Sequence, residues 1–595
     1  MPDPIVNDFS LRIATANGTG SQTSNMIIFR SLFHMGLAAS AKNLFPSNIS
    51  GLPTWYQLRV SPQGHQGRKE SWEVLLALNP ATLGDDLAEL PRGGVVIDNA
   101  DLKTPAEAFD GSIRYPVPFD TLARKEVADA RLRPKLKNLI YVGVVAELFG
   151  LEHESIRAAI ESMFSLKREV VESNWAACKI GIDYARECLE KRDPYRFERA
   201  QQTEGRIFID GNEAAALGVI FGGCTVIAWY PITPATSLAE SMVPHLHRLR
   251  TDEDGRRIFS VVQAEDEIAA IGIALGAGWA GARAMTSTSG PGISLMSENL
   301  GFGYYAEIPC VVFDVQRVGP STGLPTRTQQ SDILQVAFHS HGDTRFPMLF
   351  PADIGECFQL SWRAFDIAER HQIPVVVMSD LDLAMNTWVG DPFEYPDRPI
   401  DRGKLLTDDL IRSLDRWGRY LDIDGDGIPY RTVPGLAKDP RAAHLTRGSG
   451  HNEAAEYSED DGDYQRNLDR IARKVDGLIG DLPEPVLRGG TEGALGVIAY
   501  GSSDAAVVEA LADRGDSIPY LRLRAFPFHE AVGEFLRGRE RILVVEQNQQ
   551  GQLAQLLRMS YPESATKIDS ACYYGGLPLS AAFVGRALAD SLQKV

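Results

Sequence analysis

Short apolar runs alternate with helix-like segments along the first third of the chain. Residues 11–16 (LRIATA), 73–79 (EVLLALN) and 93–99 (GGVVIDN) have the continuous apolar character of buried strands, and residues 136–150 have helical spacing. Buried strands that alternate with helices are typical of parallel sheets covered on both faces. The pattern therefore predicts an α/β unit that ends near residue 195.

A second alternation of the same kind begins near residue 205. Two helices rich in small residues are expected at 211–223, with Asn212 as a plausible N-cap, and at 265–281. Apolar runs that read as strands occupy residues 224–231, 282–289, 308–316 and 373–380. These strands again favour a parallel sheet buried on both faces.

The pattern changes between residues 391 and 485, which are rich in Asp, Arg, Gly and Pro and poor in apolar runs. We expect an extended connection that lies largely on the surface. From about residue 490 the α/β alternation resumes, with strands at 493–503 and 541–552. The predicted organisation is thus four segments, 1–195, 205–390, 391–485 and 486–595.

Composition and charge narrow the class of protein. The 595 residues carry 79 acidic and 60 basic side chains, a formal charge of −19, which argues against a nucleic-acid or anionic-membrane binder. No apolar stretch is long enough for a membrane span, and no secretory signal is recognisable. The six cysteines are scattered without a C-x-x-C pair, so we expect a reduced, cytoplasmic protein without an iron–sulfur cluster of its own.

The junction WYPITPATSLAE (229–240) joins a predicted strand to a predicted helix and contains two prolines. Proline fixes its own φ and restrains the residue before it, so Thr233 is held in a narrow range of conformations beside Pro234. A rigid hydroxyl at the carboxyl edge of a parallel sheet suits a ligand oxygen. The alternative is a helix-capping turn in which a threonine bonds a backbone N–H.

The helix that follows carries Gly272 and Gly276 on one face and the acidic sequence Glu265-Asp-Glu267 at its start. Each glycine inside a helix is about 1 kcal/mol less favourable than alanine. Such a pair is usually retained where another backbone, a subunit or a cofactor approaches closely. The acidic residues can simply be favourable with the helix dipole.

Four further segments, in this order, carry a resemblance to a known family. YPITP, QAEDEIAAIGIALGAG, TSTSGPGISLMSENLGF and VQRVGPSTGLPTRTQQSD resemble the α subunit of 2-oxoacid:ferredoxin oxidoreductases, above all the 2-oxoglutarate type with a fused γ domain. The strand–NGTGSQ–helix start resembles that γ domain, and RLRAFPFHEA with VVEQNQQGQL resembles the C-terminal domain. The resemblance covers nearly the whole chain. It implies a γ-type domain, a pyrimidine-binding domain of a thiamine-diphosphate enzyme and a C-terminal domain like that of transketolase.

The resemblance implies roles for named residues. It implies that Glu267, with Glu265 as second choice, is the glutamate that bonds the pyrimidine ring of thiamine diphosphate. It implies that Thr233 and Arg317 bind the carboxylate of the 2-oxoacid, since an arginine fork can make two charge-assisted hydrogen bonds. Arg327 is a weaker candidate, and the alternative for either arginine is a surface ion pair.

Further contacts implied by the resemblance lie in loops. Pro231 and Ile232 of the YPITP loop and the Ser289–Gly290 turn are expected near the cofactor, although the turn can also be an ordinary strand-to-helix connection. A coenzyme A contact is expected around Gly18, Thr19 and Gly20, where half of a phosphate-binding glycine fingerprint is present.

Two metal-like patterns lie in the connecting segment. Gly425-Asp-Gly427 with Asn452 mimics the magnesium–diphosphate motif of thiamine enzymes, but neither part follows an apolar run. The loop 422–427 mimics the start of an EF-hand, but Val433 stands where a glutamate is needed. We therefore expect no metal ligand in this chain, although a divalent ion on the acidic loop stays open.

The function implied by the resemblance is oxidative, reversible decarboxylation of 2-oxoglutarate with coenzyme A, giving succinyl-CoA, CO₂ and reduced ferredoxin. A β subunit would hold the cofactor's diphosphate, Mg²⁺ and a [4Fe–4S] cluster in an (αβ)₂ heterotetramer. Run in reverse, the reaction fixes CO₂, as in a reductive tricarboxylic acid cycle. The alternatives are the same chemistry on pyruvate or a branched-chain 2-oxoacid, and a non-catalytic scaffold or CoA-binding subunit.

Overall fold

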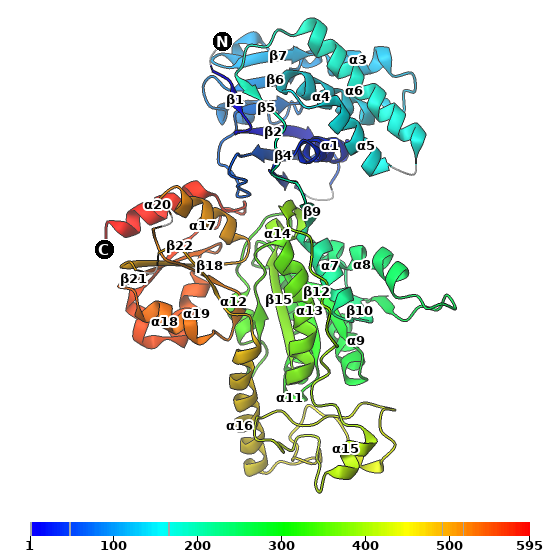
Figure 1. Cartoon of the computed structure of the whole chain (residues 1–595), viewed down its shortest axis with the longest axis vertical. Coiled ribbons are helices and arrows are strands. Elements are labelled where there is room, and N and C mark those ends of the chain that lie inside the picture. Colours follow the sequence, from blue (N-terminus) through cyan, green and yellow to red (C-terminus); the bar gives the residue numbers. More distant parts are fainter. Residues whose placement is uncertain (1–2, 47–48, 165–166, 491, 516, 595) are drawn as a thin grey trace. The chain divides into compact units, whose positions relative to one another are not determined.

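The chain was studied as a computed structural model, which describes residues 3–46, 49–164, 167–490, 492–515 and 517–594. It divides into two compact units (Figure 1). The first runs to Phe208 and also takes in residues 386–392 and 580–582, and the second comprises the remainder. Among the described residues, no helix combines the length and the apolar character that crossing a bilayer requires.

The first unit is built on a six-stranded sheet of order β3-β4-β2-β5-β6-β7. Strands β2, β5, β6 and β7 run parallel to one another, whereas β4 pairs antiparallel with both β2 and β3. The elements are β1 (Ile5–Val6), β2 (Phe9–Ala16), α1 (Ser21–His34), β3 (Ala39–Leu44), β4 (Pro53–Val60), β5 (Val74–Ala77), α2 (Leu83–Ala88), β6 (Val95–Asn99), β7 (Ile113–Val117), α3 (Phe119–Glu126), α4 (Arg133–Phe149), α5 (His153–Phe164), α6 (Arg168–Cys188) and β8 (Tyr195–Arg196).

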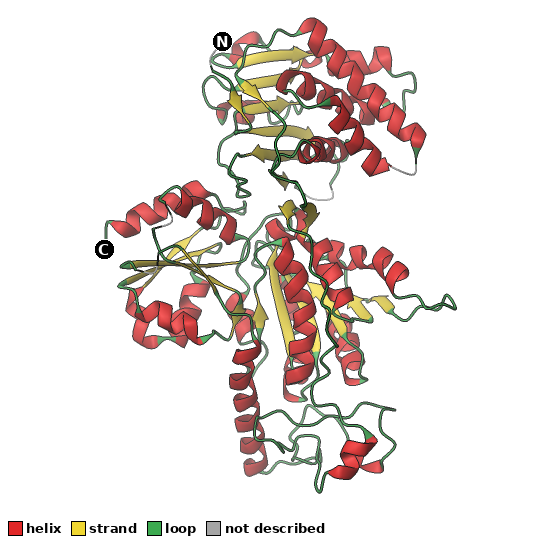
Figure 2. Ribbon diagram, viewed as in Figure 1, coloured by secondary structure: helices red, strands yellow, loops and turns green. Residues whose placement is uncertain are grey.

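One face of this sheet is covered by a large layer of helices that contains α1, α4, α5 and α6 (Figure 2). Two glycines let α4 and α6 cross closely. A Cβ atom on Gly143 would lie 1.9 Å from the carbonyl oxygen of Cys178, and one on Gly181 would lie 1.9 Å from that of Ile140. A larger residue at either position would force the two helices apart.

The second unit begins with a seven-stranded sheet of order β11-β10-β12-β13-β15-β14-β20. All neighbours are parallel except β14 and β20. Its elements are α7 (Gly211–Phe221), β10 (Val226–Trp229), α8 (Thr236–Leu249), β11 (Ser260–Gln263), α9 (Glu267–Trp279), β12 (Ala284–Thr288), α10 (Gly290–Leu295), α11 (Ser297–Tyr305), β13 (Cys310–Gln316), α12 (Ile333–Ala337), β14 (Met348–Leu349), α13 (Ile354–His371), β15 (Pro374–Asp380) and α14 (Leu381–Met385). The expected α/β class is confirmed. Two short strands, β9 (Ile207–Asp210) and β16 (Thr387–Gly390), lie where the chain passes between the units.

A second sheet, of order β17-β19-β18-β21-β22, is formed by the last part of the chain. Its pairs are parallel except for β17 with β19. The elements are β17 (Val486–Arg488), β18 (Leu495–Tyr500), α17 (Ser503–Ala512), β19 (Tyr520–Leu523), β20 (Ala525–Phe526), α18 (Glu530–Arg537), β21 (Arg541–Glu546), α19 (Gln552–Ser560), β22 (Ile568–Cys572) and α20 (Ala581–Leu592). Since β20 pairs with β14, this segment also completes the edge of the seven-stranded sheet.

The connecting segment is mostly loop, as expected, but it contains α15 (Asp408–Ser413) and the 18-residue α16 (Asp461–Leu478). The buried face of α16 carries Arg470 and Lys474, which both bond the carboxylate of Glu307, at 2.7 and 2.6 Å. Arg419 donates to the backbone carbonyl of Glu307 at 2.9 Å. The helix is therefore docked partly through buried charges, which share its inner face with the apolar side chains of Ile471, Val475 and Leu478.

Candidate active site

The loop between β10 and α8 is held by Asn212 from the facing helix α7. The Asn212 side-chain amide donates to the carbonyl oxygen of Pro234 at 2.9 Å and to Ser237 Oγ at 2.8 Å. The expected capping role of Asn212 is wrong: the N-cap of α7 is Asp210, whose carboxylate accepts from the backbone N–H of Glu213 at 2.8 Å. Asn212 lies two residues after the N-cap and bonds the loop instead. The Thr233–Pro234 peptide bond in that loop is cis.

Arg317 meets this loop directly. It follows β13 at the carboxyl edge of the sheet, is 7% exposed, and donates from Nη1 to the backbone carbonyl of Thr233 at 2.6 Å. Its Nε has no hydrogen-bond partner among the described residues. Burial lowers the pKa of the guanidinium, while the charges of Asp332 and Glu267 act in the opposite direction. The sheet edge thus brings Thr233, Arg317 and Glu267 into one neighbourhood.

Glu267 opens helix α9 and is 6% exposed, whereas Glu265 is exposed. The N-cap of the helix is Asp266, which accepts from the backbone N–H of Ala269 at 2.7 Å, so Glu267 is not needed for capping. Gly292 of α10 lies against it: a Cβ there would be 2.7 Å from Glu267 Cγ. The Glu267 carboxylate forms no hydrogen bond with any residue of the described ranges. A buried carboxylate left in this way is a natural partner for a ligand donor.

Neighbouring hydroxyl groups at the end of β12 are also without partners in the described part of the chain. Ser289 is fully buried, and neither its Oγ nor that of Ser287 makes a hydrogen bond. Gly290 follows, and its backbone lies so close to Asp332 that a Cβ would be 2.8 Å from a carboxyl oxygen. Buried polar groups are normally satisfied, so these hydroxyls also indicate room for a ligand or water.

A cleft of about 640 Å³ opens beside these residues, and most of its wall was not anticipated from the sequence. Only Gly290 and Arg317 among its lining residues were expected; Asp332 and the stretch Asn548–Gln552 of the C-terminal segment were not. The full lining is Gly290, Pro291, Ser294, Leu295, Arg317, Val318, Gly319, Pro320, Ser321, Gln329, Ser331, Asp332, Gln335, Asn548, Gln549, Gln550 and Gln552. The motif QNQQGQ was visible in the sequence, but nothing local assigned it to this wall.

Three other residues that were expected at the site do not line the cleft in the described structure. Arg327 donates to its neighbour Thr326 at 2.9 Å and does not line the cleft in the described structure. Pro231 is exposed, and Ile232 packs against the small cluster formed by Ala235 and Val315. The cofactor contacts expected of Pro231 and Ile232 therefore rest only on the position of the loop at the sheet edge.

The glycine turn of the first unit follows β2 and leads into α1. Gly18 and Gly20 have φ values of 82° and 83°, which favour glycine. Thr19 is bonded on both sides: its Oγ1 donates to Ala16 O at 2.8 Å, and its carbonyl accepts from Asn138 at 2.8 Å. The turn is a well-tied entry to the helix, with Gly18 and Gly20 exposed.

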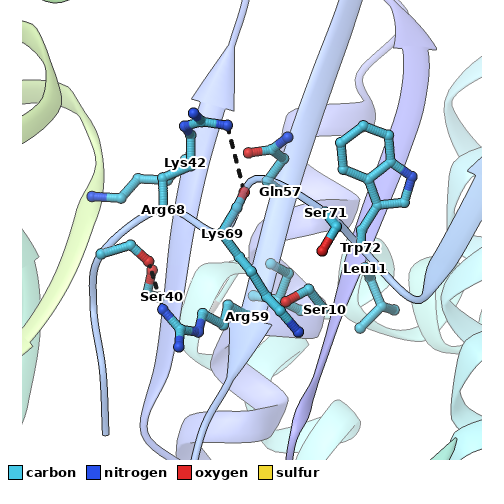
Figure 3. A pocket seen from close by; sticks show the side chains of 12 residues that line it. Ser10, Leu11, Ser40, Lys42, Gln57, Arg59, Arg68, Lys69, Ser71 and Trp72 are labelled. Atoms are coloured by element: carbon cyan, nitrogen blue, oxygen red, sulfur yellow. Dashed lines mark hydrogen bonds between the residues drawn. The ribbon is translucent and has the colours of Figure 1, made fainter. Parts of the chain in front are cut away.

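The first unit also contains a small basic pocket (Figure 3). Lys42, Arg59, Arg68 and Lys69 surround it, but its volume is only about 10 Å³. Lys69 pairs with Glu73 at 2.6 Å, Arg59 donates to Gly67 O at 3.1 Å, and Lys42 lies over the ring of Trp388. The space is smaller than a phosphate group and these cations are engaged with the protein itself.

The acidic loop of the connecting segment is satisfied by protein groups. Asp422 accepts from the backbone N–H groups of Gly425 and Gly427, and the Lys404 ammonium lies 2.6 Å from Asp424 and 2.8 Å from Asp426. Across the described ranges, no cluster of three or more His, Cys, Asp or Glu side chains has the arrangement of a metal site.

Comparison with known protein families gives two matches. Residues 217–389 match the thiamine diphosphate-binding domain of pyruvate flavodoxin/ferredoxin oxidoreductase, and residues 10–184 match the pyruvate ferredoxin/flavodoxin oxidoreductase domain. The first range contains Thr233, Glu267 and Arg317.

Full-length relatives show the same relationship. The chain is 31% identical to 2-oxoacid:ferredoxin oxidoreductase 2 subunit alpha of Aeropyrum pernix, over 93% of each chain. It is 33% identical to 2-oxoglutarate oxidoreductase subunit KorA of Mycobacterium tuberculosis, over 86% of this chain and 81% of that one. The solved 2-oxoglutarate:ferredoxin oxidoreductase of Magnetococcus marinus, with 2-oxoglutarate, coenzyme A and succinyl-CoA bound, superimposes with a TM-score of 0.87 at 30% identity, over 99% of this chain and all of that chain.

Proposed function

The chain belongs to the α-subunit family of 2-oxoacid:ferredoxin oxidoreductases, and from this membership we propose that it converts 2-oxoglutarate and coenzyme A to succinyl-CoA and CO₂ with reduction of ferredoxin. The observation that carries the proposal is the meeting of Glu267, Thr233 and Arg317 at one sheet edge, beside a polar cleft. In the proposal, Glu267 is the acid–base group there, and Arg317 and Thr233 bind the carboxylate of the substrate.

Thiamine diphosphate fits the residues around Glu267. The carboxylate is buried, it has no recorded hydrogen-bond donor in the described chain, and Gly292 leaves space against it that a Cβ would fill. When bound here, the cofactor would supply nucleophilic carbon chemistry toward a keto group. In this proposal Glu267 would hold a proton at the pyrimidine ring nitrogen. Thr288 Oγ1 lies on the same side as Glu267, since both would be approached by a Cβ on Gly292.

The substrate's carboxylate is assigned to Arg317 and Thr233. The hydrogen bond from Arg317 to the Thr233 carbonyl fixes one edge of the guanidinium, while Nε has no partner in the described chain. A planar fork held on one side can present its remaining N–H groups to a carboxylate in a defined direction. The side-chain amides of Gln329 and Gln335, which also line the cleft, are suited to the second carboxylate of 2-oxoglutarate.

The finer assembly is also a proposal. Helix α9 leaves Ile268, Gly272, Ile273, Gly276 and Trp279 exposed, and a Cβ on either glycine would meet nothing within 4 Å. The close approach inside the chain is made by Gly278, against the carbonyl oxygen of Pro309. We assign the open face of α9 to a β subunit, whose chain would pack against the two glycines as the partner in an (αβ)₂ heterotetramer.

The same β subunit is proposed to hold the cofactor's diphosphate, Mg²⁺ and a [4Fe–4S] cluster that passes electrons to ferredoxin. The six cysteines of this chain support that division, since four of them are buried singly and none pairs with another. Coenzyme A is assigned to the first unit, with Gly18–Gly20 as a contact at the carboxyl edge of its sheet.

Two measurements test the proposal. Affinity purification of the chain from its native cells is expected to yield a brown complex that contains thiamine diphosphate and a smaller, cysteine-rich partner. That complex, supplied with coenzyme A and a viologen dye, is expected to oxidise 2-oxoglutarate in preference to pyruvate and 2-oxoisovalerate. Preferred turnover of pyruvate would overturn the substrate, and a colourless protein without thiamine would overturn the reaction class.

A further inference from the structure

Two carboxyl groups meet behind the cleft, where the proposed reaction has no use for them. Asp314 lies in the central strand β13 and is fully buried; Asp332 lies immediately before α12 and lines the cleft. Neither oxygen of Asp314, nor Oδ2 of Asp332, accepts a hydrogen bond from an N–H or hydroxyl donor of the described chain. Burying three carboxyl oxygens without donors is strongly unfavourable when both groups are ionised.

The backbone N–H of Asp332 donates to Gln316 Oε1 at 3.1 Å, and Gln316 lies on the same face of β13 as Asp314. With no other donor for their buried oxygens in the described chain, the two carboxyl groups require a proton on at least one of them. Burial and the neighbouring Asp332 raise the pKa of Asp314 well above its usual range. Burial also raises the pKa of Asp332, to about 7, against the lowering effects of its bond to Asp314 and of the charge on Arg317. Near neutral pH the pair therefore changes between an uncharged form and a form with one negative charge.

The charge appears at a defined place, because Asp332 is the member of the pair that faces the cleft and Arg317. Arg317 and Asp332 feel each other's charge but form no ion pair within 4 Å in the described structure. The other titratable groups that act on this region are Glu267 from α9 and Tyr500 from β18. Helix α10 and residues 548–552 contribute only uncharged side chains to the cleft wall.

We propose that Asp314 and Asp332 form a proton-sharing pair that controls the availability of Arg317 to a ligand carboxylate. This inference rests on the proposed function. When the pair is uncharged, Arg317 has no competing anion and binds the 2-oxoacid. When Asp332 carries a charge, it competes with the substrate for the guanidinium, so binding of the substrate is linked to retention of one proton by the pair. Both aspartates are positioning residues, since they act through Arg317.

The test measures KM for 2-oxoglutarate in the purified complex, with saturating coenzyme A and a viologen acceptor, from about pH 6 to about pH 8.5, on both sides of neutrality. The inhibition constant of glutarate is measured over the same range, because glutarate offers carboxylates without reacting at a keto group. For the wild type, both constants are expected to rise above about pH 7, by up to about tenfold per pH unit, as one linked proton requires.

Two isosteric variants give opposite results if the proposal holds. In Asp332→Asn no charge can form beside Arg317, so KM is expected to be low and independent of pH. In Asp314→Asn the amide donates to Asp332 and favours its charged form, so KM is expected to be flat and about tenfold above the wild-type value at about pH 6. A purely structural pair would instead raise KM in both variants and leave the wild-type slope in place.

The control is Asp353→Asn, which replaces another buried aspartate, the N-cap of α13; asparagine caps a helix equally well. Its KM is expected to follow the wild-type pH dependence. A flat wild-type KM and a flat glutarate constant would overturn the inference without any variant. If instead no 2-oxoacid is turned over, or Arg317→Lys leaves KM unchanged, it is the proposed function that fails.

Discussion

Arg317, which follows β13, donates a hydrogen bond across 2.6 Å to the backbone carbonyl of Thr233 in the loop after β10, although β12 lies between these two strands in the sheet. The expected role of the threonine was through its hydroxyl, yet the contact in the structure uses its main chain. Through this bond, the loop before α8 fixes the orientation of the Arg317 side chain. A substitution at position 317 is therefore expected to disturb orientation as well as charge.

Arg317→Lys tests that relationship. Lysine keeps the charge but cannot bond the carbonyl of Thr233 and also present a fork to the substrate. We expect KM for 2-oxoglutarate to rise by roughly 30-fold or more, corresponding to about 2 kcal/mol or more for a weakened buried charge contact, with a smaller change in kcat. Steady-state kinetics of the complex measure both constants. A KM that rises in Arg327→Lys and stays unchanged in Arg317→Lys would reverse the assignment.

Glu267→Gln tests the acid–base group. The amide retains the shape of the side chain but cannot exchange a proton at the pyrimidine ring, so turnover is expected to fall at least about 100-fold. The matched control is Glu265→Gln, two residues earlier and exposed, for which near-normal turnover is expected. Equal thermal unfolding curves for the two variants would exclude a folding defect. Near-normal turnover of Glu267→Gln would favour a scaffold role for the chain.

Glu307→Gln tests the buried ionic cluster in the second unit. The Glu307 carboxylate bonds Arg470 and Lys474 while its carbonyl accepts from Arg419, and all four residues are at most 5% exposed. Removing the single anion leaves three buried cations, so the free energy of unfolding is expected to fall by about 3–5 kcal/mol. Denaturant unfolding measures it, and Asp409→Asn in an exposed pair with Arg412 is expected to change it by less than about 0.5 kcal/mol.

The same cluster predicts a pH dependence of stability. Burial alone would raise the pKa of Glu307, but Arg470, Lys474 and Arg419 outweigh it and lower the pKa to about 2. Because the folded-state pKa lies below that of the unfolded chain, this contribution is present above about pH 4.5 and is lost as the pH falls toward about 2. Acid titrations of unfolding should show this loss in the wild type and not in Glu307→Gln. Parallel curves for the two proteins would contradict the prediction.

Gly276→Leu tests the open face of α9. A side chain at this position meets nothing within 4 Å in the chain itself, and leucine is a better helix former by about 0.8 kcal/mol, so the isolated chain is expected to be no less stable. Assembly with the β subunit is expected to weaken by more than tenfold, because leucine fills the space a partner backbone needs. Analytical ultracentrifugation measures the assembly. Gly477→Leu, on the exposed face of α16 and equally uncrowded, is the control that should leave it unchanged.

Much of the framework was predictable because it follows from local pattern. The buried strands of both α/β segments, the small-residue helix 267–279 and the strand ends that carry Thr233 and Arg317 lie where the apolar runs indicated. Parallel strands are continuous apolar runs, and their carboxyl ends converge on one edge. Glu267 is the first helical residue and is buried, whereas Glu265 lies before the N-cap Asp266 and is exposed.

The rest depended on contacts between distant segments. Helix α16 was not predicted, although Ile471, Val475 and Leu478 recur at helical spacing, because the segment is dominated by charged residues. Two of these, Arg470 and Lys474, look like surface residues but face a buried glutamate. Asn212 was taken for a cap because the local sequence cannot show the loop that it holds. The pairing of Asp314 with Asp332, and the wall formed by residues 548–552, join positions far apart in sequence, which no periodicity records.

The antiparallel pairing of β20 with β14 has a consequence for folding of the chain during its synthesis. A ribosome releases the seven-stranded sheet from β10 onward, but the flank of β14 is covered only after residue 526 has emerged. Until then the nascent chain displays a strand with unpaired backbone groups, and a bare flank of this kind recruits strands from other chains. Chains truncated before β20 should consequently aggregate, because a strand of a neighbouring polypeptide pairs with β14 in place of β20.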